Sequence, residues 1–113
     1  MYLCLHLLVG AVSIATLLIG YYHGLLLRDI DADLLTDKMS STGLLTADEK
    51  FVISSGHTVH HRNWLLLEHV RHMKLKPLLQ FCKLVEEEWP EIGSQLIKGM
   101  YIRMYPYSLG SYH

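Results

Sequence analysis

Histidine is the residue type in this sequence whose spacing comes closest to that of a chemical site. His57 and His61 are four residues apart, and His69 and His72 are three apart, so each pair can share a helix face. Zinc needs about four ligands that converge tetrahedrally, and Glu68-His69-Val70-Arg71-His72 is not the His-Glu-x-x-His pattern of metalloproteases. These four histidines are therefore weak metal candidates. We expect solvent-facing side chains that gain charge on mild acidification, because an unperturbed histidine has a pKa of about 6.5.

No other set of residues has the spacing of a catalytic site. No serine has a histidine and an aspartate in a recognisable arrangement, and there is no glycine-rich phosphate loop. Cys82 lies on an apolar helical stripe, where we expect a buried and unreactive thiol. Cys4 and Cys82 do not make a disulfide framework. The net charge of -1 lacks the dominant basic face that nucleic-acid binding needs. We therefore predict a protein that is not an enzyme, needs no cofactor and does not bind nucleic acid.

The N-terminal segment is the most apolar part of the chain. Residues 2–22 contain no Asp, Glu, Lys or Arg, and a helix of that length rises about 31 Å, close to the hydrocarbon thickness of a bilayer. Residues 1–23 are predicted to form one long apolar helix, a candidate transmembrane anchor. Arg28 then favours a cytoplasmic location for the rest of the chain. The alternatives are a cleaved signal peptide, a segment of the soluble core that belongs to the bundle, and an alternative first exon whose product never meets a membrane.

Capping signals and apolar periodicity divide the rest of the chain into helices. Thr46 and Glu49 have the spacing of a capping box, Asp31 or Asp33 can cap the preceding helix, and Gly43 is a candidate left-handed C-cap. Helices are expected over residues 31–41, 46–54, 58–74, 77–89 and 91–97. Residues 99–113 are expected to form an irregular, tyrosine-rich tail.

These helices are expected to pack into one antiparallel bundle. Apolar residues recur at spacings of three and four, which places them on one face of each helix. The predicted fold class is all-α: a bundle of five or six helices over residues 24–98, preceded by the long apolar helix. The predicted core is Leu35, Phe51, Leu66, Val70, Leu78, Cys82 and Val85.

Several short motifs follow one another in the order found in a known family. They are Leu27-Arg28-Asp29-Ile30, Leu34-Leu35-Thr36-Asp37-Lys38-Met39, the turn Gly43-Leu44-Leu45-Thr46, Leu65-Leu66-Leu67-Glu68-His69-Val70, Leu78-Leu79-Gln80-Phe81-Cys82 and Trp89-Pro90-Glu91-Ile92. Over residues 25–97 they resemble a caspase-recruitment domain (CARD) of the death-fold superfamily. The resemblance is atypical at the start, because an uncharged apolar run stands where the first part of the family's first helix carries charges.

Charged residues are segregated along the chain. The acidic set is Asp31, Asp33, Asp37, Asp48 and Glu49, and the basic set is Arg28, Arg62, Arg71, Lys74 and Lys76. From the residues alone, a solvated surface without a partner explains this layout equally well. The resemblance to CARDs implies instead that the acidic set of one molecule docks on the basic set of the next, in open rather than closed assemblies.

The resemblance implies a function as well as a fold. It predicts a non-enzymatic adaptor or regulator that binds other CARD proteins in apoptotic or inflammatory signalling. The competing hypothesis is a single-pass membrane microprotein, held in the membrane by residues 2–22, whose helical domain serves only for packing.

Overall fold

The computed structural model describes residues 13–109, and within that range the chain is entirely helical, with no strand. Its helices are α2 (Ile14–Asp29), α3 (Ala32–Ser41), α4 (Ala47–Ser54), α5 (Val59–Val70), α6 (Leu75–Glu88) and α7 (Pro90–Leu109). The predicted all-α class is confirmed.

Most of these helices start where a side chain caps the first turn. The hydroxyl of Thr46 accepts from the Glu49 amide and the Glu49 carboxylate accepts from the Thr46 amide, so the predicted capping box is present. Asp31 caps α3 by accepting from the amides of Asp33 and Leu34. Gly43 follows α3 with a φ of 82°, the left-handed conformation predicted for it. These local signals act within a few residues, and for that reason they can be read from the sequence.

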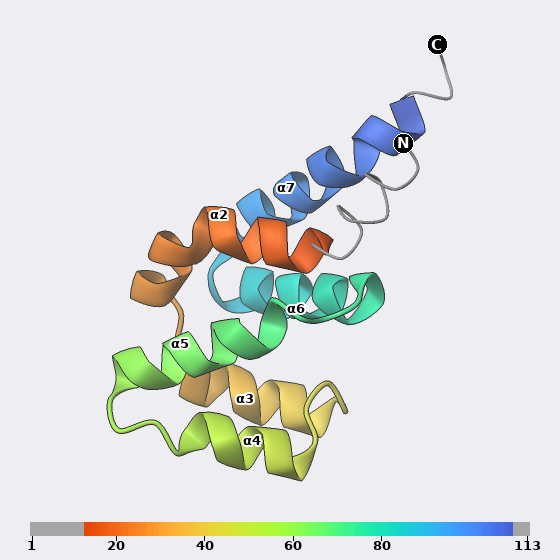
Figure 1. The fold of residues 1–113 in the computed structure, drawn as a ribbon. Helices are drawn as coiled ribbons and strands as arrows, with labels where there is room; N and C mark the ends of the chain where they lie inside the picture. The colour runs from red at the N-terminus through yellow and green to blue at the C-terminus, as the bar shows by residue number, and fades with distance from the viewer. Residues whose placement is uncertain (1–12, 110–113) are drawn as a thin grey trace, which may run out of the picture.

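The helices pack as two pairs with two further helices between them. Helices α2 and α7 lie side by side, α3 and α4 lie side by side at the opposite end, and α5 and α6 connect the two pairs (Figure 1). The core has contributions from every helix, and Phe81 of α6 is the largest fully buried side chain.

The predicted core is correct except at one position. Six of its residues are buried: Leu35, Leu66, Val70, Leu78, Cys82 and Val85. Phe51 is the exception, because 75% of its surface is exposed and Ile53 is the side chain that α4 buries instead. Three consecutive apolar residues, Phe51-Val52-Ile53, cover more than half of a helix circumference. Only the packing of α4 on α3 and α5 decides which of them faces inward.

The single apolar helix predicted for residues 1–23 is not shown. Ser13 has an extended backbone and caps α2 through the Thr16 amide, so a helix that continues unbroken through residue 13 is wrong. Residues 1–12 lie outside the described residues. Helix α2 crosses the expected boundary at residue 23, and Ala15, Leu18 and Ile19 belong to the same core as the rest of the bundle. Between residues 13 and 109, no helix has both the length and the apolar character needed to cross a membrane.

The irregular tail predicted from residue 99 is also wrong as far as Leu109, because α7 runs through it. Leu96 and Met100 are buried, and Met104 packs against the core. Their spacing of four residues continues the inward face of the helix beyond residue 97. Helix α2 provides the surface that this stripe covers.

The crossing of α6 and α7 depends on Gly93. A Cβ atom at this position would overlap the backbone of Glu86, so the two helices can approach closely only at a glycine. We expect Gly93→Ala to lower the free energy of unfolding by about 1–3 kcal/mol, the usual cost of overpacking. Gly24→Ala is the matched control, because its Cβ would meet nothing within 4 Å. Because alanine favours a helix more than glycine does, Gly24→Ala in α2 should raise the free energy of unfolding by up to ~1 kcal/mol. Urea unfolding measures the stability of both variants. An equal change in the free energy of unfolding for Gly93→Ala and Gly24→Ala would contradict the close approach of α6 and α7.

Candidate docking surfaces

Five of the ten charged residues predicted to form docking faces are paired with an Asp, Glu, Lys or Arg side chain within the bundle. Asp33 and Arg62 were assigned to opposite faces, yet the carboxylate and guanidinium are bonded to each other at 2.9 Å. Asp37 pairs with Lys50 at 2.8 Å. The other internal pairs are Arg28 with Asp29 and Arg71 with Glu68. Exposed pairs of this kind contribute only about 0–1 kcal/mol each, but they satisfy charges that would otherwise be available to a partner.

Arg62 is additionally a structural residue. Its guanidinium also donates to the carbonyl oxygen of Gly56, and it thereby ties the turn before α5 to α3. Substitution of Arg62 would therefore change the packing of three helices as well as a surface charge. A substitution of Arg62 therefore cannot test its surface charge apart from its structural contacts.

The two members of the predicted basic set without an ion-pair partner among residues 13–109 lie at the turn into α6. Within residues 13–109, neither Lys74 nor Lys76 takes part in an ion pair or a side-chain hydrogen bond. Leu75 between them is exposed. We call Lys74, Leu75 and Lys76 the basic turn. Lys74 is the N-cap residue of α6 and forms no capping hydrogen bond, and the first turn of that helix contains no acidic residue. The positive end of the helix dipole adds to the charge of the two ammonium groups.

An acidic groove lies between α4 and α5. It has a volume of about 450 Å³. The lining residues are Asp48, Glu49, Val52, Ile53, Leu65, Glu68, His69 and His72. We call it the α4–α5 groove. Val52, Ile53 and Leu65 are its apolar residues, and Asp48, Glu49 and Glu68 are its carboxylates, of which Glu68 is paired with Arg71. This is the composition of a site for a side chain with an aliphatic stem and a positive end.

Glu49 is the carboxylate of this groove that also belongs to a helix cap. The hydrogen bond from the Thr46 amide lowers the pKa of Glu49, and nearby His69 acts in the same direction. The His69 Nε2 atom lies 3.7 Å from the Glu49 carboxylate. The helix cap therefore holds Glu49 in its charged form at the mouth of the groove.

Exposed apolar side chains stand beside the groove on α4. Phe51 and Val52 follow Asp48 by three and four residues, so the three side chains share one outward face of the helix. Large exposed aromatic residues next to a groove are frequent anchors of protein interfaces. Sequence reasoning placed Phe51 in the core and missed this surface.

The histidines are distributed over two places. His69 and His72 line the α4–α5 groove, whereas His57 stacks on His61 before and at the start of α5. In the part of the chain that the structure describes, no three His, Cys, Asp or Glu side chains are placed to hold a metal ion. Cys82 is fully buried as predicted, and burial raises the pKa of its thiol to about 12. The thiolate is therefore scarce near neutral pH.

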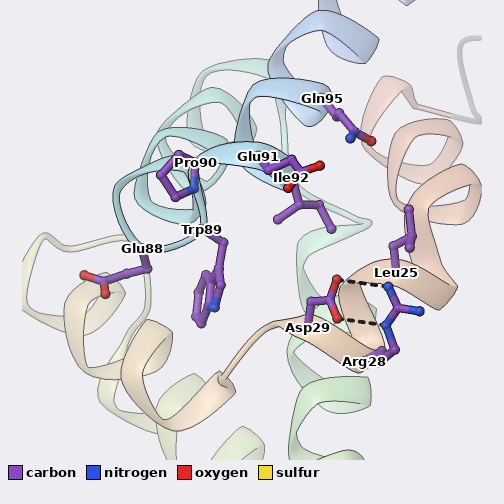
Figure 2. A pocket seen from close by; sticks show the side chains of 9 residues that line it. All are labelled: Leu25, Arg28, Asp29, Glu88, Trp89, Pro90, Glu91, Ile92 and Gln95. Carbon is purple, nitrogen blue, oxygen red and sulfur yellow. Dashed lines mark hydrogen bonds and ion pairs between the residues drawn. The ribbon is translucent and has the colours of Figure 1, made fainter.

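A second hollow lies between the C-terminal end of α2 and the junction of α6 with α7 (Figure 2). Its volume is about 540 Å³. Figure 2 shows the bidentate pair of Arg28 and Asp29 at one side and Trp89 with Pro90 at the other. The Arg28 guanidinium, by its hydrogen bonds, lowers the pKa of Asp29. Arg28, a member of the predicted basic set, is therefore largely neutralised at the rim of this hollow.

Comparison with protein-family models, with curated proteins and with solved structures finds no match to this chain. Residues 13–109 form a small all-helical bundle with an acidic groove between α4 and α5 and a basic turn at the start of α6. Its function has to be inferred from those features.

Proposed function

We propose that the chain is a CARD-type interaction domain, a non-enzymatic adaptor or regulator that recruits other CARD proteins in apoptotic or inflammatory signalling. The motifs over residues 25–97 and the helical bundle are consistent with that family. Because one fold serves many functions, the surface chemistry has to support the proposal independently.

The observation that carries the proposal is the unpaired charge of the basic turn. Arg28, Arg62 and Arg71 each have a carboxylate partner within the bundle, but Lys74 and Lys76 have none in the part of the chain that the structure describes. The α4–α5 groove presents carboxylates over an apolar floor. A lysine of the basic turn fits such a groove on another molecule, with its stem on the floor and its ammonium group at the rim.

This complementarity supports docking between unlike surfaces. Opposite potentials speed the encounter and disfavour wrong partners. Because the two docking surfaces differ, a molecule that has bound one neighbour through its basic turn still has its α4–α5 groove free for another molecule. The proposed domain can therefore associate with itself in open assemblies as well as with a related CARD.

The competing function is the single-pass membrane microprotein, favoured by the uncharged run of residues 2–22. In that case the bundle binds no CARD partner, and substitutions on the surfaces described above would leave the function of the protein unchanged. For the adaptor we propose a cytoplasmic location of the bundle. Assay of the full chain for both recruitment and membrane retention separates the two functions.

Phe51 gives a test that does not change charge. We expect Phe51→Ser to weaken association about 10-fold or more, because an exposed aromatic anchor is lost from the α4 face. Stability should hardly change, since the side chain is exposed in the bundle. Light scattering over a concentration series and pull-down of CARD proteins give the measurement.

Val59→Ser is the matched control for Phe51→Ser. Val59 is also an exposed apolar residue on a helix, but it lies in the first turn of α5 and does not line the groove. If the wild type and both variants associate equally strongly, α4 is not part of the interface.

A further inference from the structure

Helix α2 is apolar on the face that points away from the core as well as on the buried face. Leu17, Tyr21 and Leu25 repeat every four residues and are exposed, with Leu17 at 46% and Tyr21 at 73%. The opposite face buries Ala15, Leu18, Ile19 and Leu26. A surface helix of a bundle normally carries polar residues outside. No charged residue occurs in α2 before Arg28.

Helix α7 extends this outer surface. Leu25 and Gln95 line the same hollow, so the α7 face that bears Gln95 lies on the same side as the α2 stripe (Figure 2). Lys98 and Ile102 follow Gln95 by three and seven residues and therefore share its face. Ile102 is 64% exposed. The two helices contact each other and lie next to one another in Figure 1.

The charges on this surface are of one sign. After Glu91 the only charged residues of α7 are Lys98 and Arg103. The Arg103 guanidinium lies over the Tyr21 ring, 5.0 Å from its centroid, and thus brings its charge to the α2 stripe. We call Leu17, Tyr21, Lys98, Ile102 and Arg103 the α2–α7 face. Among the carboxylates around these helices, Asp29 and Glu91 line the hollow at the far end of α2, and Glu86 accepts a hydrogen bond from the Ser94 hydroxyl of α7.

Apolar and aromatic side chains interspersed with cations, without acids, fit the surface of an anionic membrane. A second copy of the chain fits less well, because a two-fold contact would bring Lys98 and Arg103 of both copies together. The sequence adds apolar length directly before α2, since residues 1–12 contain no Asp, Glu, Lys or Arg.

We propose that the α2–α7 face binds an anionic membrane surface peripherally while α2 stays in the bundle. The binding differs from a transmembrane anchor, because passage of α2 through the bilayer would withdraw Ala15, Leu18 and Ile19 from the core. Peripheral binding leaves those contacts in place. It is independent of CARD recruitment and uses none of the groove or basic-turn residues.

The experiment is flotation of the full chain with vesicles of phosphatidylcholine, with or without phosphatidylserine. We expect the affinity for vesicles with phosphatidylserine to be about 10-fold or more higher, since each cation near an anionic surface contributes ~1 kcal/mol. Added salt should release the protein. Lys98→Glu with Arg103→Glu should remove the preference for phosphatidylserine, and Leu17→Ser with Ile102→Ser should weaken binding to both vesicles.

Lys83→Glu is the matched control, because Lys83 is an exposed lysine of α6 outside the α2–α7 face. Circular dichroism verifies that each variant folds, and CARD recruitment by the Lys98/Arg103 variant should equal that of the wild type. Three results would each overturn the proposal: equal binding to both vesicle types, unchanged binding of the Lys98/Arg103 variant, or retention through carbonate extraction. Dimerisation without vesicles that Ile102→Ser abolishes would assign the face to a second copy instead.

Discussion

Replacement of Lys74 and Lys76 by glutamate is expected to lower recruitment of a CARD partner about 100-fold or more. Like charges placed against an acidic face cost several kcal/mol, and each 1.4 kcal/mol is a factor of about 10 in affinity. Neither lysine has an ion-pair partner among residues 13–109, so the exchange breaks no such internal contact. Arg71 is a poorer choice, because its exchange also breaks the pair with Glu68. Pull-down and light scattering measure the loss, and thermal unfolding should change little.

Charge reversal in the acidic α4–α5 groove is the complementary experiment. Asp48→Lys should damage the acidic side. Asp31 and Glu49 are avoided because both serve in helix caps, and Asp37 is avoided because its exchange also breaks the pair with Lys50. A mixture of the acidic-side and basic-side variants should pair through the unmutated surfaces but not grow further. Lys83→Glu is the control for net charge. Undiminished association of the Lys74/Lys76 variant, with helicity retained, would identify the charge layout as a solvated surface.

Replacement of Asn63 by alanine is expected to cost about 3–5 kcal/mol. Asn63 is buried, and its Oδ1 atom accepts from the Ala32 amide at 2.8 Å. Its Nδ2 atom donates to the carbonyl oxygens of Leu27 and Ile30 at 3.1 and 2.9 Å. One side chain of α5 thus satisfies the backbone where α2 ends and α3 begins. Each buried group left without its partner costs about 1–3 kcal/mol, against a total stability of ~5–15 kcal/mol.

Thr36→Val is the matched control for Asn63→Ala. Thr36 is also buried and polar, but its hydroxyl donates only to the Asp33 carbonyl within its own helix. We expect it to cost about 1 kcal/mol, the usual net value of one hydrogen bond. Urea unfolding at fixed pH measures both variants. If Asn63→Ala costs no more than Thr36→Val, the α2–α3 junction is held by apolar packing alone.

Much of the fold could be predicted because its signals are local. The capping box of Thr46 and Glu49, the Asp31 cap and the left-handed Gly43 each involve residues at most a few positions apart. The stripe of Leu78, Cys82 and Val85 has the helical period and is buried as predicted. Interactions between near neighbours have few alternatives, so the sequence specifies them directly.

The candidate surfaces were only partly predictable. The sequence separates acidic from basic residues, but Asp33 and Arg62 are 29 positions apart and their pairing follows from the packing of α3 on α5. The tertiary structure therefore decided which charges are already satisfied and which, such as those of Lys74 and Lys76, have no ion-pair partner among residues 13–109.

What the sequence by itself determined are the existence of the helices between Ala32 and Glu88, the caps of α3 and α4 and most of the core. The boundary between α5 and α6 differs from the prediction, because α5 ends at Val70 and α6 begins at Leu75. Only the tertiary structure decided that Phe51 faces outward and that α7 continues past residue 97. It likewise decided that Asn63 joins α2 to α3. The reason is physical: a helix needs contacts three or four residues apart, whereas the side that faces inward depends on which distant helix covers it.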